Sequence, residues 1–248
     1  MTSYTYPFAS GPVKEAIATF AAYAISIDDL TTEFAAELQS YATNLMLRRP
    51  QGHSLLQGFT NHLSEQAEIF GSYGGDMIIK GAMEFISSVV VEAKYMDSVH
   101  LSKHTTDFLV PFRAKTGVAE PFAFFCFPED THPEQRDLEK YLAVIPTLML
   151  FLDYVNDILS FYKEHMKPGD SASFIKSYAR MHGLRLSDSL KRAKLEALGV
   201  IGRLRMICMH DPKLFGHLEQ FIQGYIWFHL RFRRYKLSEL NIPLARRA

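Results

Sequence analysis

Long stretches of this chain repeat their apolar side chains every three to four residues, and this period restricts the fold more than any other feature. Residues 13–26 show it clearly, because their apolar side chains fall on one stripe of a helix: Val13, Ile17, Phe20, Ala21 and Ala24. Strict alternation of apolar and polar residues, which marks a half-buried strand, extends over only a few residues. The pattern therefore predicts an all-α protein.

The same period and the turn residues between its segments predict the organisation of the chain. We expect helices over residues 13–26, 30–47, 55–70, 76–95, 142–165, 190–209 and 214–234, and one more that Asp170 to Ser173 caps and that runs to about Arg180. The expected turns are Arg49–Gly52, Gly74-Gly75, Pro128–Pro133, Pro168-Gly169 and Asp211-Pro212. The chain contains no internal repeat, low-complexity segment or linker, so we expect one domain over residues 1–248.

Charge and composition exclude several classes of function. The 27 basic and 27 acidic residues give a formal net charge of zero, so no attraction to nucleic acid or to an anionic membrane is expected. No run approaches 18 uninterrupted apolar residues, which argues against a membrane span. Cys126 and Cys208 form no CxxC pair, and residues 1–13 do not read as a signal peptide. We therefore expect a cytoplasmic protein.

The strongest chemical signal is the segment from Asn156 to Glu164, within an expected helix. Positions i, i+4 and i+8 share a helix face, so Asn156, Ser160 and Glu164 present a carbonyl, a hydroxyl and a carboxylate together. Oxygen ligands of mixed charge suit octahedral magnesium that also binds water and phosphate oxygens. The alternative is a set of polar contacts inside a helical bundle.

A second signal lies at the end of the first apolar helix, where Asp28 and Asp29 follow an apolar run. Adjacent carboxylates near a core are costly unless a cation compensates them. Taken alone, such a pair is more often solvated. Together with the Asn156 motif, it becomes a candidate for the opposite side of one metal site.

Three cationic side chains complete the set: Arg113, Lys163 within the Asn156 motif, and Arg234, which precedes Tyr235 at the end of the last expected helix. Guanidinium groups bind phosphate oxygens in pairs, and an ammonium group acts as a point charge. Each of these residues alone is as well explained by a surface ion pair. Together they supply what a departing diphosphate needs.

These segments resemble a known family. The sequence Asn-Asp-Ile-Leu-Ser-Phe-Tyr-Lys-Glu, from Asn156 to Glu164, resembles the Asn/Ser/Glu metal motif of class I terpene cyclases, and most closely that of the fungal trichodiene synthase-like sesquiterpene cyclases. Asp28-Asp29 resembles the aspartate-rich motif of the family. Arg113 falls where the family keeps its diphosphate-sensing arginine, and Arg234-Tyr235 resembles its C-terminal Arg-Tyr pair.

The resemblance implies a class I terpenoid synthase helical bundle and a prenyl diphosphate substrate, with farnesyl diphosphate favoured. It implies three Mg²⁺ ions between the two acidic motifs, with metal ligands Asp28, Asn156, Ser160 and Glu164. The diphosphate would be bound by Arg113, Lys163, Arg234 and Tyr235. Aromatic faces stabilise a carbocation, and the candidates are Phe20, Tyr23, Phe85, Phe124, Trp227 and Phe228.

The chain departs from the family pattern at three places. Thr32 stands at the fifth position of the aspartate-rich motif, where the family has an acid, and Phe232 stands where the C-terminal motif often begins with one. Asp28 lies so early that we expect one or two N-terminal helices of the family to be missing. Trp227 and Arg234 are seven residues apart and are expected to share a helix face. A homodimer is compatible with the family pattern.

Three other functions share features with this chain. A chain-elongating prenyl synthase shares the fold but normally needs two aspartate-rich motifs, and this chain has one. A di-iron bundle needs repeated Glu-x-x-His pairs, whereas that spacing occurs here from Glu129 to His132, in a proline-flanked loop. The remaining alternative is a catalytically silent cyclase homologue that binds a prenyl diphosphate or an apolar ligand.

Overall fold

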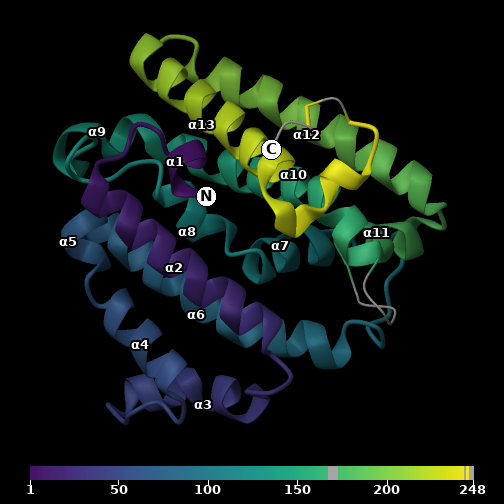
Figure 1. Cartoon of the computed structure of the whole chain (residues 1–248), viewed down its shortest axis with the longest axis horizontal. Coiled ribbons are helices and arrows are strands. Elements are labelled where there is room, and N and C mark those ends of the chain that lie inside the picture. The colour runs from purple at the N-terminus through teal and green to yellow at the C-terminus, as the bar shows by residue number, and fades with distance from the viewer. Residues whose placement is uncertain (167–172, 243, 246–248) are drawn as a thin grey trace. The chain divides into compact units, whose positions relative to one another are not determined.

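The computed structural model describes residues 1–166, 173–242 and 244–245, and within these ranges every regular element is a helix (Figure 1). The all-α prediction is therefore confirmed. Backbone contacts divide the chain into two compact units. Unit 1 contains Met1–Phe8, His100–Arg113 and Ala143–Ala248, and unit 2 contains Ala9–Val99 and Ala114–Leu142. One domain over residues 1–248 stays a prediction.

Unit 2 is built around a long helix. Its helices are α2 (Gly11–Asp29), α3 (Ala35–Met46), α4 (Ser54–Leu63), α5 (Gln66–Phe70), α6 (Ser72–Tyr95), α8 (Ala119–Phe124) and α9 (Glu134–Tyr141). Helix α6 contacts α3, α5 and α8, and α2 contacts α4. The core is rich in aromatic rings: the ring centroid of Phe20 lies 5.3 Å from that of Phe59 and 5.0 Å from that of Phe125. The apolar stripe predicted on residues 13–26 thus faces the core, as expected.

The start of α6 corrects two predictions. The segment 55–70 forms two helices, α4 and α5, and the expected turn at Gly74-Gly75 lies inside α6. The turn is instead at Gly71, whose φ of 78° suits glycine. Gly75 is needed for packing, because a Cβ there would lie 2.6 Å from the backbone Cα of Ala67 in α5. Gly75 therefore allows the close approach of α6 to α5.

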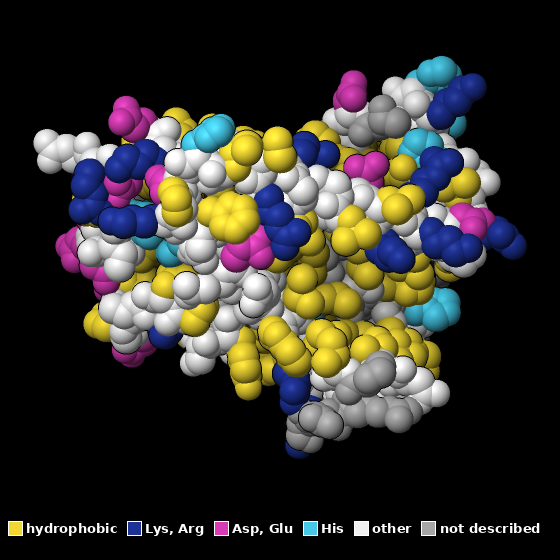
Figure 2. Space-filling model, turned by 90° about the horizontal axis from the view of Figure 1, so that it is seen from above, with side chains coloured by type: hydrophobic (Ala, Val, Ile, Leu, Met, Phe, Trp, Pro, Cys, Tyr) yellow, Lys and Arg dark blue, Asp and Glu magenta, His cyan; other side chains and the backbone are white. Residues whose placement is uncertain are grey.

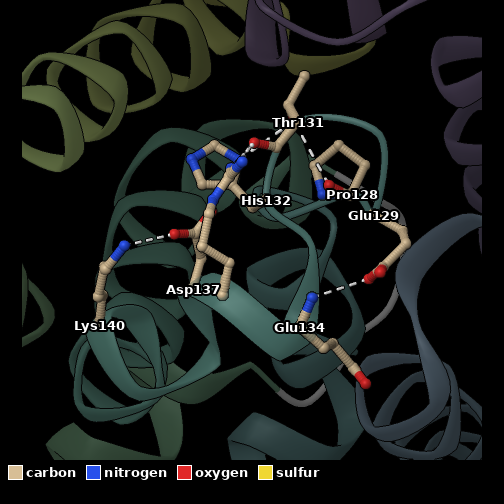
Figure 3. A network of polar contacts seen from close by, with 8 residues as sticks. Pro128, Glu129, Thr131, His132, Glu134, Asp137 and Lys140 are labelled. Carbon is tan, nitrogen blue, oxygen red and sulfur yellow. Dashed lines mark hydrogen bonds and ion pairs between the residues drawn. The ribbon is translucent and has the colours of Figure 1, made fainter.

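Glu134 links the first turn of α6 to a network of polar contacts in the loop before α9, and Figure 3 shows that network. The carboxylate of Glu134 accepts hydrogen bonds from the backbone N–H groups of Tyr73 (3.0 Å) and Gly74 (2.6 Å) in the first turn of α6. Figure 3 shows Glu129 in turn accepting from the backbone N–H of Glu134, at 3.0 Å. The predicted turn Pro128–Pro133 is confirmed, and Glu129 is used there as a helix cap.

Unit 1 is built around α10. Its elements are α1 (Thr2–Thr5), most of α7 (Thr106–Thr116), α10 (Ile145–His165), α11 (Phe174–His182), α12 (Leu186–Cys208), α13 (Pro212–Arg231) and the 3₁₀ turns η1 (Leu142–Val144), η2 (Arg233–Tyr235) and η3 (Leu237–Glu239). Helix α10 contacts α11, α12, α13 and η2, and Figure 1 shows α12 running next to α13. Helices α1, α7, α8 and α9 were not predicted from the sequence, because their segments are short, contain prolines or have few apolar residues.

The end of α13 corrects a further prediction. The helix expected to reach residue 234 ends at Arg231, and Phe232 is extended, with φ −81° and ψ 121°. Trp227 and Arg234 therefore do not share a helix face. The break has a packing reason: on a continuous helix, residues 228 and 235 would be about 10 Å apart along the axis. After the break, the ring centroids of Phe228 and Tyr235 lie 5.7 Å apart, in a cluster with Leu237.

The helix that carries the Asn156 motif is strongly apolar. By length and composition alone, the helical stretch Glu134–His165 is long and apolar enough to cross a membrane, and it is the one such stretch in the described residues. The core helix of a soluble protein passes the same test, and α10 buries Leu148, Phe151 and Leu152 in unit 1. The predicted absence of a membrane partner stays a prediction.

Ser173 accepts a hydrogen bond from the backbone N–H of Lys176 and caps α11, as expected, whereas Pro168-Gly169 and Asp170 lie outside the described residues.

On the surface, hydrophobic side chains form patches between charged ones (Figure 2). On α12 the exposed ones include Leu195 and Met206. A homodimer stays a prediction.

Candidate active site

Arg113 on α7 joins the Asn156 motif on α10. Its Nε donates to Asp157 Oδ1 at 2.7 Å, and its Nη2 donates to Asn156 Oδ1 at 3.1 Å. Its Nη1 lies 3.5 Å from Asp153 Oδ1. The Arg113 side chain is 14% exposed, so these are largely desolvated ion pairs. The structure therefore brings together two residues that the sequence singled out separately, Arg113 and Asn156.

Two buried carboxylates share this single guanidinium group. Burial raises the pKa of Asp153 to about 6 and that of Asp157 to about 7, although the charge of Arg113 lowers both. In the described residues, Oδ2 of each aspartate is buried without a hydrogen-bond partner. Asp153 was not predicted from the sequence. The spacing could have indicated it, because an aspartate one turn before Asp157 in an apolar helix lies on the same face.

The predicted metal ligands on α10 offer oxygen atoms of three kinds. Ser160 is 1% exposed, and its hydroxyl has no hydrogen-bond partner in the part of the chain that the structure describes. Glu164 is partly exposed, and its Oε1 lies 3.8 Å from Nζ of Lys163. A buried hydroxyl without a partner is costly in a folded protein. A magnesium ion fits this set, because it would take the orphaned hydroxyl oxygen together with the amide and carboxylate oxygens.

No group of three or more His, Cys, Asp or Glu side chains in the described ranges is arranged to hold a metal ion. The predicted set on α10 is of another kind, because it combines the carboxylate of Glu164 with the amide of Asn156 and the hydroxyl of Ser160. Its role as a metal site stays a prediction.

The C-terminal Arg-Tyr pair lies in η2, which contacts α10. Tyr235 is buried, and burial raises its pKa. Nζ of Lys163 lies 5.8 Å from the centroid of the Tyr235 ring, within reach of a cation–π contact. Arg234 is half-buried, and its charge opposes the rise in the pKa of Tyr235. Three of the four predicted diphosphate-binding residues thus lie in one region of unit 1.

A buried histidine on α13 also contacts the motif. His229 is 0% exposed, and its Nε2 lies 3.2 Å from Nδ2 of Asn156. Its Nδ1 lies 2.8 Å from the carbonyl oxygen of Tyr225. Burial lowers the pKa of His229 to about 4, so the ring is neutral near pH 7. His229 was not predicted from the sequence, because a lone histidine in an apolar helix has no characteristic spacing to other site residues.

The aspartate-rich motif lies in unit 2. Asp28 and Asp29 form the exposed last turn of α2, which confirms their predicted place at the end of the first apolar helix. Two carboxylates beside the negative end of a helix dipole are mutually unfavourable, and a nearby cation would relieve this. Because Asp28 and the α10 residues belong to different units, their meeting at one metal site stays a prediction.

The predicted cavity aromatics differ in their surroundings. Phe20, Phe85, Phe124 and Phe228 are buried, and Tyr23 is half-buried. Trp227 is 37% exposed, and the guanidinium carbon of Arg231 lies 5.0 Å from its ring centroid. A role of these rings beside a carbocation stays a prediction.

Comparison with known proteins agrees with these features. A family model described as trichodiene synthase matches residues 1–242. The chain is 34% identical over 238 residues to an (E)-beta farnesene synthase of Metarhizium brunneum (strain ARSEF 3297). The aligned region covers 96% of this chain and 72% of that protein. It is 30% identical over 235 residues to terpene synthase BipA of Cochliobolus sativus, covering 94% of this chain and 71% of that protein.

A solved structure has the same fold. The crystal structure of linalool/nerolidol synthase from Streptomyces clavuligerus matches with a TM-score of 0.68, over 91% of this chain and 85% of that one. The two sequences are 15% identical, so this likeness concerns the fold alone.

Proposed function

This chain belongs to the trichodiene synthase family and has the all-α class I terpenoid synthase fold, and we propose that it is a sesquiterpene synthase. In the proposed reaction, the enzyme ionises farnesyl diphosphate in the presence of magnesium, releases diphosphate and cyclises the resulting carbocation. The choice of farnesyl diphosphate as substrate is supported by the (E)-beta farnesene synthase among the relatives and by the match to the trichodiene synthase family model.

The observation that carries the proposal is the cluster on α10. Arg113 is held against Asn156 and Asp157, one turn from a buried hydroxyl of Ser160 that has no partner among the described residues. An arginine beside neutral and charged oxygen ligands is the arrangement that a magnesium diphosphate group requires. A purely structural helix contact would have satisfied the Ser160 hydroxyl.

We propose that Asn156, Ser160 and Glu164 on α10 would serve as magnesium ligands together with Asp28 on α2, and that the complete site would take three ions. The chemistry that bound magnesium supplies is neutralisation of the leaving diphosphate.

The side chains of this chain bind the diphosphate and protect the cation. Arg113 would exchange its hydrogen bond to the Asn156 oxygen for one to a diphosphate oxygen, and the other proposed diphosphate contacts are Lys163, Arg234 and the Tyr235 hydroxyl. The aromatic side chains would surround the carbocation with π faces and exclude water, which prevents early quenching.

The test is an incubation of purified protein with farnesyl diphosphate, with and without magnesium, followed by gas chromatography and mass spectrometry. We expect a sesquiterpene that requires magnesium and that disappears in Asn156→Ala. Asn61→Ala is the matched control, because Asn61 is exposed on α4 and its side chain contacts Gln57 of the same helix. Folded protein that yields no product from farnesyl, geranyl or geranylgeranyl diphosphate would contradict the proposal and favour the silent homologue.

The same experiment addresses what the sequence left open. Product analysis identifies the carbon skeleton, acyclic or cyclic, and the comparison of substrates identifies the preferred chain length. The cytoplasmic location stays a proposal and is tested by microscopy of a tagged chain.

A further inference from the structure

The buried His229 contacts a proposed metal ligand, yet the proposed reaction gives it no role. We propose that His229 is a positioning residue: it fixes the side-chain amide of Asn156 so that the oxygen, and not the nitrogen, faces Arg113 and the metal. This inference rests on the proposed function, in which Asn156 is a magnesium ligand.

The two hydrogen-bond partners of the Asn156 side chain, His229 and Arg113, require the same orientation of its amide. The Tyr225 carbonyl can only accept, so the Nδ1 atom of His229, 2.8 Å away, must carry a hydrogen. In a neutral ring, Nε2 then has a free lone pair and accepts from Nδ2 of Asn156 at 3.2 Å. At the other end, Arg113 can only donate, so the Asn156 atom that it contacts at 3.1 Å must be the oxygen.

A flipped amide would be wrong at both ends. It would place the Asn156 NH₂ group against the guanidinium group of Arg113 and the amide oxygen against the lone pair of His229 Nε2. Each contact would join two donors or two acceptors, and the fully buried ring of His229 could not turn to water instead. The histidine therefore decides which atom of the amide is available to a metal ion.

The ring is held firmly enough to impose this choice. His229 is 0% exposed, and its ring centroid lies 4.4 Å from that of Tyr235 and 4.5 Å from that of Tyr225. The Tyr225 hydroxyl donates to the carbonyl oxygen of Leu152 on α10, at 3.2 Å. The histidine is thus packed between two rings, one of which is hydrogen-bonded to the helix that carries Asn156.

Removing such a partner usually weakens metal binding by about 10- to 100-fold. We expect His229→Phe, which keeps an aromatic ring but removes the acceptor, to raise the magnesium concentration needed for half-saturation by that factor. His229→Gln can again accept from Asn156 through its amide oxygen and should recover much of the loss. Tyr225→Phe is the matched control: it breaks the bond to Leu152 in the same cluster but keeps the Tyr225 carbonyl.

The readout is a magnesium titration in the presence of inorganic pyrophosphate, measured by isothermal titration calorimetry. Circular dichroism verifies that each variant is folded. A folded His229→Phe variant that binds magnesium like the wild type would overturn the inference. Equal weakening in His229→Phe and Tyr225→Phe would also overturn it, because that result would indicate a packing role. A wild-type protein without any magnesium response would overturn the proposed function, and this inference with it.

A second measurement needs no variant that alters the core. The ¹⁵N spectrum of histidine-labelled wild-type protein distinguishes the two neutral tautomers of a ring. We expect His229 to carry its hydrogen on Nδ1 at neutral pH, as the contact with the Tyr225 carbonyl requires. Observation of the Nε2-protonated tautomer would overturn the assignment of the Asn156 amide.

Discussion

Ser160 offers the sharpest separation of stability from function in this protein. Its hydroxyl is buried on α10 and, in the described ranges, has no hydrogen-bond partner. Such a group costs about 1–3 kcal/mol of folding free energy. Ser160→Ala removes the cost and loses a few dispersion contacts worth roughly 0.1–0.2 kcal/mol each. We therefore expect the variant to be more stable than the wild type without magnesium, by about 1 kcal/mol.

In a thermal melt, a gain of about 1 kcal/mol corresponds to a rise in Tm of roughly 2–4 °C for a chain of this size. With magnesium and inorganic pyrophosphate, the order should reverse. The wild type gains stability from ligand binding, and each tenfold loss of affinity in Ser160→Ala removes about 1.4 kcal/mol of that gain at high ligand concentration. The assay is therefore one pair of melts for each protein, with and without these ligands.

Ser189 on α12 is the matched control. It is also a buried helical serine of unit 1, but its hydroxyl donates to the carbonyl oxygen of Ile175 at 3.0 Å. The gain in helix propensity from serine to alanine is similar at both positions and cancels in the comparison. Ser189→Ala should be destabilised by about 1–2 kcal/mol and should keep the full magnesium response.

Equal destabilisation of the Ser160 and Ser189 variants would refute the reasoning, because it would show that the Ser160 hydroxyl has a structural partner. An unchanged magnesium response in Ser160→Ala would remove this residue from the proposed metal site.

Three further changes have effects that follow from particular contacts. Arg113→Ala leaves two buried carboxylates without their counterion and should lower the unfolding free energy by about 3–5 kcal/mol, measured by urea titration; a loss below about 1 kcal/mol would contradict the burial of these pairs. Gly224→Ala should destabilise the packing of α1 on α13 by several kcal/mol, because the new Cβ would overlap the Tyr4 carbonyl oxygen. Hydrogen exchange should report faster opening of α1 in this variant. Gly216→Ala is the control and should be neutral, because a Cβ there would meet open space. Glu134→Gln keeps the size but loses the charge that caps α6, and should cost about 1 kcal/mol in a thermal melt; an unchanged Tm would show that the cap contributes nothing.

The sequence by itself determined the features that depend on local geometry. The period of the apolar residues predicted most helices, because burial of one helical stripe requires that spacing. The common face of Asn156, Ser160 and Glu164 followed from helix geometry once α10 was recognised. The resemblance of the motifs to class I terpene cyclases, carried by a few residues at fixed spacing, agrees with the family comparison.

Only the tertiary structure decided which side chains meet across long sequence separations. Arg113 contacts Asp157 over 44 residues, and Asn156 contacts His229 over 73 residues. Helix α13 ends after Arg231, which allows Tyr235 to return to the core, and no proline or glycine follows Arg231 to indicate this end in the sequence. These features depend on burial and on partners from other helices, which set the protonation, the tautomer and the orientation of each group. Helix periodicity is a property of consecutive residues, whereas such environments exist only after distant helices have packed together.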